Sequence, residues 1–365
     1  MDDKKKQDSL RQLKKKSTLI DFSSNDYLGL ARSADLFANI QRRAERLRLP
    51  FNGSTGSRLL SGNSELAEEV EVQLAAVFHA PRTLLFNSGY NANIAVLSSL
   101  PQRGDTIICD ELAHASIRDG ARLSYATRFN FRHNDVDDLR KKIRQATGNV
   151  FVAVESNYSM DGDESPLEEL VALSEELGFT LILDEAHSTG SYGEGGGGLA
   201  LEKKLQDKIP VRIYTFGKAM GVHGACVAGD ETLIQYLVNF ARPLIYTTAL
   251  PPHSLLSIQA AFDFVGKNAP LQKILQEKIK RFLSGFEKMK WTFVKSNSAI
   301  QNIIIPGNGH VKELSHFLEH HGFDCRPILS PTVKEGAERI RICLHTFNTD
   351  AEIAELNNVL SEFEA

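Results

Sequence analysis

Residues 181–198 read LILDEAHSTGSYGEGGGG, and this stretch has three interpretations that imply different folds. Residues 184–187 spell DEAH, the acidic box of a nucleic-acid-dependent ATPase. The glycines between 193 and 198 have the spacing G-x-G-x-x-G of a dinucleotide-binding loop. A buried strand that ends in a carboxylate and an imidazole can instead hold a ring-shaped cofactor. The rest of the chain decides among the three.

The first two interpretations lack their partner motifs. An ATPase needs a phosphate loop of the form G-x-x-x-x-G-K-[ST] before the acidic box. The sequence has none, because Gly217-Lys218 is followed by alanine and comes after the box. A dinucleotide loop joins its strand directly and has an acidic residue about 20 positions later. Here the glycines begin several residues past the predicted strand, and the later position falls in IPVRIYTFG, which has no carboxylate. The glycine run is therefore predicted to be a surface loop.

Composition and charge indicate an ordinary globular protein. The 365 residues are 42% hydrophobic and 24% charged, with a net charge of −4. A nucleic-acid partner is not expected, since such proteins usually carry a basic balance. Spanning a bilayer takes about 20 apolar residues in a row, and no such run occurs, so no membrane association is expected. Residues 1–16, MDDKKKQDSLRQLKKK, lack the apolar core of a signal peptide. The predicted location is the cytoplasm, with the lysines on a solvated arm.

The spacing of the four cysteines also agrees with a cytoplasmic protein. Cys109, Cys226, Cys325 and Cys343 are scattered, without C-x-x-C spacing. Reduced thiols are expected, because zinc sites use closely spaced cysteines and disulfide frameworks occur in small, cysteine-rich secreted chains. No metal site is predicted.

Apolar runs alternate with helix-like segments through the first two thirds of the chain. The predicted strands are 83–86, 106–110, the start of the 150s, 180–186 and 211–217, with helical patterns after the first three. This alternation predicts an α/β fold whose mainly parallel sheet has helices on both faces. The continuous apolar character of FVAV and TLILD is typical of strands buried on both sides.

The pattern changes after residue 252. One long helical stretch is predicted at 253–289, followed by strands near 299–306 and 338–344. We therefore expect an N-terminal segment (1–27), a large domain (28–267) and a smaller α+β C-terminal domain (268–365).

Polar residues gather where the predicted strands end, which is the edge where such sheets bind ligands. Lys218 follows a strand among glycines and small residues, and Asp184 ends the neighbouring one. Pyridoxal 5′-phosphate (PLP) needs a lysine for a Schiff base, an acid at its pyridine nitrogen and a phosphate cradle. Ser88-Gly89-Tyr90 stands between a strand and a helix, where free N–H groups favour an anion.

Each residue alone has a simpler explanation. A lone lysine is usually at the surface, and an aspartate can cap a helix. His114 and His187 could pack or bond a neighbouring carbonyl. Their joint placement at the ends of successive strands, where one ligand could touch all of them, favours the cofactor interpretation.

Several long motifs resemble those of one family, the α-oxoamine synthases, which are PLP enzymes of fold type I. The resemblance covers nearly the whole chain from residue 21. The matching stretches are FSSNDYLGL (22–30), GSRLLSG (56–62), HASI (114–117), HNDV (133–136), SMDGD (159–163), DEAHSTG (184–190) with GEGGGG (193–198), TFGKAMGVHGA (215–225), FARPLIYTTALPP (240–252), SAIQ (298–301) and PTVKEGAERIRI (331–342).

The resemblance implies a catalytic set of Lys218, Asp184, His114 and His187. Lys218 would form the Schiff base and then move protons at the substrate α-carbon. Asp184 would pair with the pyridine nitrogen, and His114 would stack on the ring. His187 and Ser159 would contact the phenolic oxygen.

The resemblance also implies how the phosphate is bound. The backbone groups of Gly89 and Tyr90, with Thr215, would hold it. Thr247 or Thr248 would reach the phosphate of the neighbouring subunit, since the family's active sites lie at a dimer interface. A homodimer with shared active sites is therefore expected.

For the substrate, Arg341 would bind the amino-acid carboxylate, and Asn25 and Thr332 would line the same entrance. The implied reaction is the decarboxylative condensation of L-alanine with a pimeloyl thioester in biotin biosynthesis, with coenzyme A or an acyl carrier protein as carrier. Glycine or serine with another acyl-CoA is the alternative. The chain departs from the family at Ala67, where a histidine is frequent, and before residue 21, where nothing matches.

Overall fold

The computed structural model describes Leu13 and residues 18–47, 52–286, 289 and 291–363. It divides into two compact units. Unit 1 comprises Met1–Gly29, Ser159–Asp163 and Pro270–Ala365, and unit 2 comprises Leu30–Tyr158 and Glu164–Ala269. Most of the expected basic arm at 1–16 lies outside the described residues. Within the described part, no helix combines the length and the apolar character needed to cross a bilayer.

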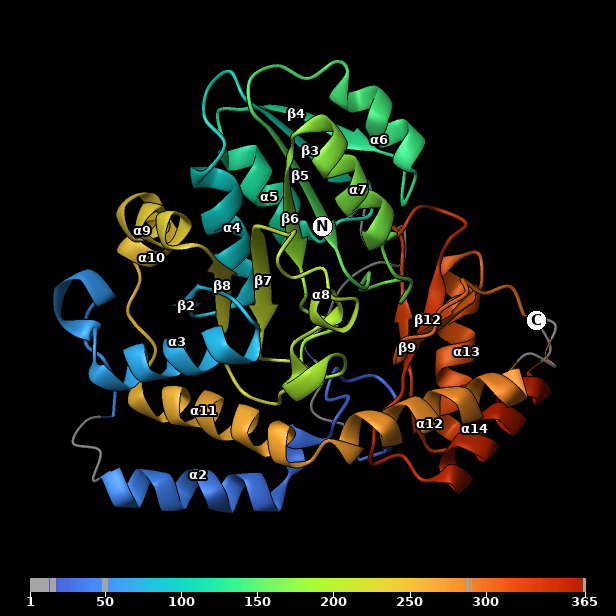
Figure 1. Cartoon of the computed structure of the whole chain (residues 1–365). Coiled ribbons are helices and arrows are strands. Elements are labelled where there is room, and N and C mark those ends of the chain that lie inside the picture. Colours follow the sequence, from blue (N-terminus) through green and yellow to red (C-terminus); the bar gives the residue numbers. More distant parts are fainter. Residues whose placement is uncertain (1–12, 14–17, 48–51, 287–288, 290, 364–365) are drawn as a thin grey trace. The chain divides into compact units, whose positions relative to one another are not determined.

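Unit 2 is built on a seven-stranded sheet with the order β2-β8-β7-β6-β5-β3-β4 (Figure 1). The strands from β7 to β4 run parallel, whereas β8 is antiparallel to both of its neighbours. The bounds are β2 Arg82–Phe86, β3 Thr106–Asp110, β4 Thr127–Phe131, β5 Val150–Glu155, β6 Thr180–Asp184, β7 Val211–Thr215 and β8 Ala225–Gly229. The α/β prediction with a mainly parallel sheet is confirmed.

The two faces of the sheet follow from the alternation of side chains along each strand. In β6, Ile182 belongs to the hydrophobic core on one face, while Leu181 and Leu183 belong to the core on the other. Strand β5 alternates in the same way, with Ala153 on the first face and Val152 on the second. Two separate cores explain why these strands are apolar throughout.

Helices cover both faces (Figure 1). The first core is closed by α4 (Gly89–Ser99), α5 (Ala115–Leu123), α9 (Glu231–Phe240) and α10 (Arg242–Ile245). The second is closed by α6 (Val136–Ile143), α7 (Leu167–Leu177) and α8 (Leu199–Glu202). Beyond the β2 end of the sheet, α3 (Glu65–Val77) packs on α11 (Pro252–Lys267), which also packs on α2 (Ala34–Leu47).

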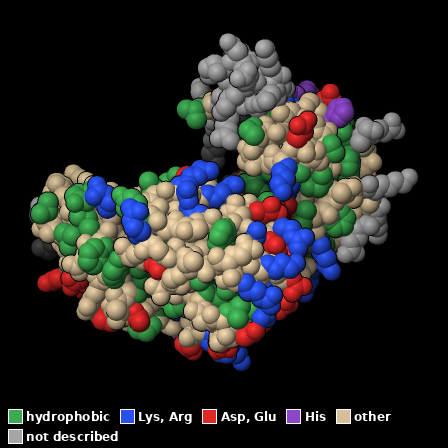
Figure 2. All heavy atoms as spheres, turned by 90° about the horizontal axis from the view of Figure 1, so that it is seen from above, with side chains coloured by type: hydrophobic (Ala, Val, Ile, Leu, Met, Phe, Trp, Pro, Cys, Tyr) green, Lys and Arg blue, Asp and Glu red, His purple; other side chains and the backbone are tan. Residues whose placement is uncertain are grey.

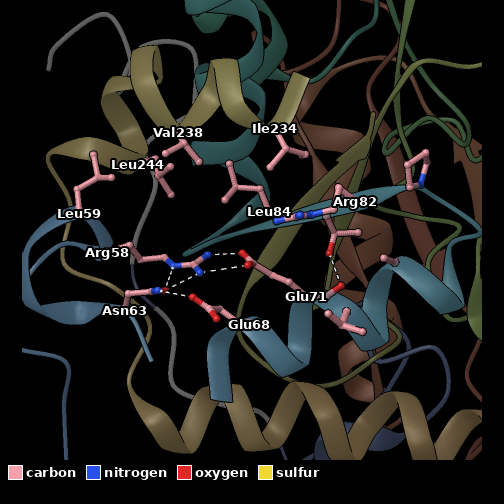
Figure 3. Close-up of a pocket in the computed structure, with 14 residues that line it drawn as sticks. Arg58, Leu59, Asn63, Glu68, Glu71, Arg82, Leu84, Ile234, Val238 and Leu244 are labelled. Carbon is pink, nitrogen blue, oxygen red and sulfur yellow. Dashed lines mark hydrogen bonds and ion pairs between the residues drawn. The ribbon is translucent and has the colours of Figure 1, made fainter. Parts of the chain in front are cut away.

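The edge strand β2 is protected by a side chain of α3. Glu71 Oε1 accepts a hydrogen bond of 2.8 Å from the Leu85 N–H. Its other oxygen, Oε2, receives Arg58 Nη2 at 3.1 Å, and Arg58 Nη1 also pairs with Oε1 (Figure 3). Asn63 Oδ1 accepts from the same guanidinium at 2.7 Å. An unpaired donor of the edge strand is thereby satisfied, which reduces the tendency of such edges to recruit another strand.

Unit 1 contains two small sheets. Strands β11 (Arg326–Ile328), β12 (Arg339–Cys343) and β9 (Ile300–Ile304) form an antiparallel sheet, and β1 (Ile20–Asp21) pairs in parallel with β10 (Phe323–Asp324). The helices are α12 (Pro270–Phe286), α13 (Asn308–His320) and α14 (Asp350–Glu362). The strands predicted near 299–306 and 338–344 are present.

The single helix predicted at 253–289 is wrong. The chain forms α11 to Lys267 and α12 from Pro270, with a break between them. Pro270 explains the break, because a proline disfavours helical backbone at the residue before it. Positions 287 and 288 of the predicted helix lie outside the described residues.

Charged side chains of both signs share the surface. On the face that Figure 2 shows, Lys and Arg lie in several small groups with Asp and Glu beside them. This mixture matches a chain whose 42 basic residues are nearly balanced by 46 acidic ones.

Candidate functional site

The predicted cofactor residues of unit 2 gather at the carboxyl ends of β5, β6 and β7. Asp184 is the last residue of β6, and it lies between Glu155 of β5 and Ile213 of β7 in the sheet register. Thr215 ends β7, and Lys218 comes three residues later. Parallel strands that end together present these side chains at one edge.

Asp184 is buried and held by two donors. Its Oδ2 accepts from Asn93 Nδ2 at 2.6 Å, and its Oδ1 accepts from the Ala186 N–H at 2.8 Å. Hydrogen bonds to both oxygens stabilise a carboxylate and fix its orientation. Asp184 can therefore serve as a preset negative charge opposite a protonated ring nitrogen.

The predicted phosphate cradle lies where α4 begins. Ser88 caps the helix, with its Oγ accepting from the Asn91 N–H at 3.3 Å. The N–H groups of Gly89 and Tyr90 open the helix, where backbone donors have no intrahelical acceptor. A Cβ on Gly89 would lie 2.0 Å from Thr215 Oγ1, so the helix start and the Thr215 hydroxyl are in direct contact. This concentration of donors at a helix N-terminus suits a phosphate.

Only the backbone of Tyr90 belongs to this cradle. Its side chain is exposed, and its hydroxyl donates to Asp119 Oδ2 at 2.6 Å. This hydrogen bond raises the pKa of Tyr90.

His114 caps helix α5 and is tied down at two points. Its backbone N–H donates to Glu155 Oε1 at 2.6 Å, and its Nδ1 lies 2.7 Å from Ser116 Oγ. Burial lowers the pKa of His114, and the ammonium of Lys218 lowers it further, while the Asp184 carboxylate acts in the opposite direction. His114 is thereby favoured as a neutral imidazole near neutral pH.

Glu155 is buried beside the same charges. Burial raises its pKa to about 8, with the Asp184 carboxylate adding to the rise and Lys218 opposing it. Because Asp184 and Lys218 influence both His114 and Glu155, the four groups surround one point of unit 2. Two groups with perturbed pKa values, His114 and Glu155, in one cluster are typical of a functional site.

Lys218 stands in a short connection between β7 and β8 that hydrogen bonds close. The Phe216 N–H donates to Gly224 O at 2.9 Å, and the Gly221 N–H donates to Lys218 O at 2.9 Å. Gly221 has a φ of +65°, and a Cβ there would lie 2.3 Å from the Ala31 N. Glycine is therefore required for the chain to hold Lys218 at this place.

His187 is buried in the turn that follows β6, and the adjacent Glu185 anchors the glycine run. The Glu185 carboxylate accepts the N–H groups of Leu199 at 3.1 Å and Ala200 at 2.8 Å. A Cβ on Gly198 would meet this carboxylate at 2.9 Å. The predicted surface loop is thus packed on a buried acid instead of lying free, and Gly193 to Gly198 contains a short 3₁₀ turn (Glu194–Gly196).

Thr247 and Thr248 follow α10 and lie beside residue 87, which directly precedes the cradle. The Thr248 carbonyl accepts from Asn87 Nδ2 at 2.9 Å. Thr247 lines a small cavity together with Asn87 and Arg58. The two threonines are therefore linked to the segment that carries Ser88.

A larger cavity of about 440 Å³ lies beside the edge strand of unit 2 (Figure 3). Its wall combines the Arg58–Glu71 pair with apolar side chains of α3 and α9, among them Val72 and Val238. None of the predicted site residues lines it, so the cavity and the candidate site are different places in unit 2.

The remaining predicted residues belong to unit 1. Arg341 donates to Asn25 Oδ1 at 3.0 Å and to the Ser159 carbonyl at 3.0 Å. The structure thus brings Arg341, Asn25 and Ser159 together. Thr332 lies in an exposed turn, where its N–H donates to Leu329 O at 2.8 Å.

Sequence reasoning missed three polar residues of the site: Asn93, Ser116 and Glu155. Ser116 lies within the HASI motif, and Glu155 ends an apolar strand just as Asp184 does. Glu155 could have been found from the sequence, since an acidic residue at the end of a buried strand is rarely left unpaired. Asn93 lacks such a signal, because its role depends on how α4 packs.

These residues fit PLP in three respects. A buried, doubly hydrogen-bonded carboxylate suits a pyridinium nitrogen, an amine stands nearby, and the Gly89–Thr215 contact provides an anion cradle. Across the described residues, no group of three or more His, Cys, Asp or Glu side chains is arranged to hold a metal ion.

Comparison with known proteins gives a consistent result. Residues 17–360 match the model of the family described as aminotransferase class I and II. An 8-amino-7-oxononanoate synthase of Emericella nidulans is 42% identical, over 92% of this chain and 87% of the relative. The enzyme of the same name from Pseudomonas entomophila is 39% identical, over 94% and 88% respectively.

Two solved structures have the same fold. Serine palmitoyltransferase of S. paucimobilis, described with a bound PLP–myriocin aldimine, superposes with a TM-score of 0.88 at 26% identity, covering 93% of this chain and 86% of that one. The 8-amino-7-oxononanoate synthase of Francisella tularensis gives a TM-score of 0.81 at 28% identity, covering 94% and 97%.

Proposed function

The chain belongs to the aminotransferase class I and II family, and from this premise we propose that it is a PLP-dependent C-acyltransferase that makes 8-amino-7-oxononanoate for biotin biosynthesis. Its substrates would be L-alanine and a pimeloyl thioester, and carbon dioxide and the free thiol of the acyl carrier would be released. The relatives of that name, at 37–42% identity over most of the chain, support this assignment.

One observation carries the proposal: Asp184, Lys218, His114 and the Gly89–Thr215 contact surround one point at the carboxyl edge of a single sheet. A small phosphorylated pyridine would meet an acid, an amine and a phosphate cradle there at once. When bound, PLP supplies an electron-accepting ring that stabilises the carbanion left when a bond to the α-carbon breaks.

The residues of unit 2 would divide the work as follows. Asp184 would hold the proton on the ring nitrogen through its negative charge. Lys218 would hold the cofactor through its Nζ and would serve as the general base that takes the α-proton. His114 would cover the ring face, and His187 would contact the phenolic oxygen.

The phosphate would be held by Ser88, the backbone N–H groups of Gly89 and Tyr90, and the Thr215 hydroxyl. This arrangement follows from the helix start at Gly89, since the positive end of the helix dipole favours an anion.

For unit 1, we propose that Arg341 binds the amino-acid carboxylate through its planar guanidinium. Asn25 supports the arginine by its 3.0 Å hydrogen bond. Ser159 would contact the phenolic oxygen of the cofactor, and Thr332 would line the substrate entrance.

A second candidate is an α-oxoamine synthase that uses serine or glycine with another acyl-CoA. The TM-score of 0.88 to a serine palmitoyltransferase favours keeping this candidate. The higher identity to 8-amino-7-oxononanoate synthases favours alanine.

We also propose a homodimer in which Thr247 or Thr248 reaches the partner's phosphate site. Unit 2 exposes large apolar side chains that suit a protein interface, including Leu60 at 86% and Tyr246 at 72% exposure. Sedimentation velocity should give one species of twice the chain mass. A cytoplasmic location is proposed as well, supported by four free thiols.

The test of the function uses purified protein with L-alanine, glycine or L-serine, each with pimeloyl-CoA or a pimeloyl carrier protein, and mass spectrometry of the product. We expect 8-amino-7-oxononanoate from alanine alone. Lys218→Ala should abolish it, whereas the control Lys208→Ala, on the surface, should not. Turnover by Lys218→Ala at the wild-type rate, or product only from serine or glycine, would contradict the assignment.

A further inference from the structure

Helices α4 and α5 cross at very short distance in unit 2. A Cβ on Gly120 of α5 would lie 2.9 Å from Leu97 Cβ and 3.0 Å from the Asn93 carbonyl of α4. The missing side chain therefore allows the two helices to approach. As a result, the side chain of Asn93 reaches both the start of α5 and the end of β6.

Asn93 joins Asp184 to Ser116. Its Nδ2 donates to Asp184 Oδ2 at 2.6 Å and to Ser116 Oγ at 3.0 Å, and the side chain is buried. Its Oδ1 has no hydrogen-bond partner in the described part of the chain. The opposite orientation of the amide would place this oxygen against the carboxylate. The amide is thus oriented by Asp184, and both of its N–H groups are used.

Ser116 passes this orientation on to His114. Since the Ser116 hydroxyl accepts from Asn93, its own hydrogen is available for His114 Nδ1, 2.7 Å away. The Ser116 backbone N–H also donates to Nδ1, at 3.2 Å. A backbone N–H is only a donor. The hydroxyl contact and this longer backbone contact therefore both favour Nδ1 as an acceptor, with the ring proton on Nε2, and loss of the shorter one weakens that preference.

We propose that Asn93 and Ser116 are positioning residues that form a relay from Asp184 to His114 and hold His114 as the neutral Nε2–H tautomer. The inference rests on the proposed function only in so far as Asp184 and His114 face the cofactor there. In that case, one relay sets both the acid at the ring nitrogen and the imidazole on the ring face.

The charges around His114 agree with a neutral ring. Burial lowers its pKa, and the cations of Lys218 and Arg118 lower it further, whereas the carboxylates of Asp184 and Asp119 raise it. Glu155 binds the His114 backbone N–H from strand β5. Protonation at Nδ1 would also break two accepted hydrogen bonds, which the relay opposes.

The first test reads the tautomer directly in cofactor-free protein. Long-range ¹H–¹⁵N spectra of protein labelled at the histidine ring distinguish Nε2–H, Nδ1–H and imidazolium, and His114→Gln identifies the signal. We expect wild-type His114 to be the Nε2–H form from about pH 6.5 to 8. An Nδ1–H form or an imidazolium at about pH 7.5 overturns the proposal.

The second test perturbs the relay with Asn93→Leu and Ser116→Ala. Each should add Nδ1–H tautomer and should weaken PLP binding by about tenfold in a fluorescence titration. The matched control is Ser98→Ala, which removes a hydroxyl of α4 that bonds only its own helix, at Ile94 O. Because the two residues act in series, the double variant should lose no more than the worse single variant.

Tautomer and affinity that stay within twofold of wild type in both variants, or losses that simply add, contradict the relay. If Asn93→Leu does not fold, the wild-type spectrum and Ser116→Ala still decide. The tautomer is measured without cofactor or substrate. A protein that shows the Nε2–H form but makes no oxononanoate therefore refutes the proposed function and leaves the relay standing.

Discussion

A single methyl group at Gly89 tests the phosphate cradle. In Gly89→Ala the new Cβ would lie 2.0 Å from Thr215 Oγ1 and 3.2 Å from Thr215 Cβ, so the helix start or β7 must shift. We expect the free energy of unfolding to fall by about 1–3 kcal/mol, which is typical of overpacking. PLP affinity should fall as well, because the donors move apart. Urea denaturation and a PLP titration measure the two effects.

The matched control for this substitution is Gly266→Ala in α11, where a Cβ would meet nothing within 4 Å. An exposed helical glycine replaced by alanine should be neutral or slightly stabilising. If Gly89→Ala behaved like Gly266→Ala, the contact between Gly89 and Thr215 would not be tight in solution.

The raised pKa of Glu155 should make the free energy of unfolding depend on pH. Its folded pKa of about 8 lies above the ordinary 4.5, so the folded state binds the proton more tightly than the unfolded state. This contribution to stability is complete below pH 4.5 and is lost as the pH rises through 8. Glu155→Gln keeps the oxygen that accepts from His114 but cannot ionise. In cofactor-free protein it should exceed wild type in stability by a few kcal/mol near pH 8.5, at about 1.4 kcal/mol per pKa unit.

Chemical denaturation of both proteins at about pH 5 and pH 8.5 measures this difference, with the exposed Glu169→Gln as the control. The advantage of Glu155→Gln should be much smaller at the lower pH. An advantage that is equal at the two pH values would mean that the carboxyl of Glu155 titrates normally.

Among single residues, those proposed to carry the chemistry were easier to predict from the sequence than the residues that position them. Lys218 and Asp184 could be named because their types and their positions at strand ends are both visible along the chain. Asn93 and Ser116 could not, since their meeting depends on the approach of two helices at Gly120. Such a distance is a property of packing and leaves no periodic mark in the sequence.

At the scale of elements, the edge of the large sheet depends on Glu71. In Glu71→Ala the Leu85 N–H would lose its acceptor. The Arg58 guanidinium would lose its anion and keep only its bonds to Asn63 (Figure 3). The expected loss is about 2–4 kcal/mol of unfolding free energy, because a half-buried cation is left without its anion. Glu68→Ala, which removes an exposed bond to Asn63, should cost much less. Equal losses in the two variants would show that the β2 edge needs no such protection.

The elements that the sequence missed have physical explanations. Strand β8 (ACVAG) consists of small residues, and its place between β2 and β7 is fixed by pairing rather than by an apolar run. Strand β4 (TRFNF) lies at the other edge of the sheet, is partly exposed and carries polar residues. In both cases pairing with the neighbouring strand stabilises a segment whose own residues have little preference for a strand.

For the whole molecule, we predict that the thiols do not react with thiol reagents in the native state. All four cysteines are free and buried, and burial raises the pKa of each thiol, that of Cys109 to about 12. Thiolates are the reactive form, so Ellman's reagent should titrate less than one equivalent in native protein and four after denaturation. Rapid reaction of the native protein would show that one of these side chains becomes exposed.

The architecture was predictable at the same scale because alternating strands and helices admit few arrangements. The predicted domain limits at 27/28 and 267/268 stay a prediction. Segment Ser159–Asp163 groups with unit 1 although it follows β5 of unit 2 in the chain. No local sequence pattern predicts that this segment groups with unit 1, since its contacts come from residues more than a hundred positions away. The ion pair of Asp161 with Arg339 is an example.

The closed connection between β7 and β8 makes Lys218 a tethered reagent. Its backbone is fixed by the bonds at Phe216 and Gly221, so any movement of its amine must come from the side chain. A base confined in this way acts at an effective molarity of about 10⁵ M or more in well-oriented cases. Methylamine added to Lys218→Ala, even near molar concentration, should therefore restore only a small fraction of the lost rate.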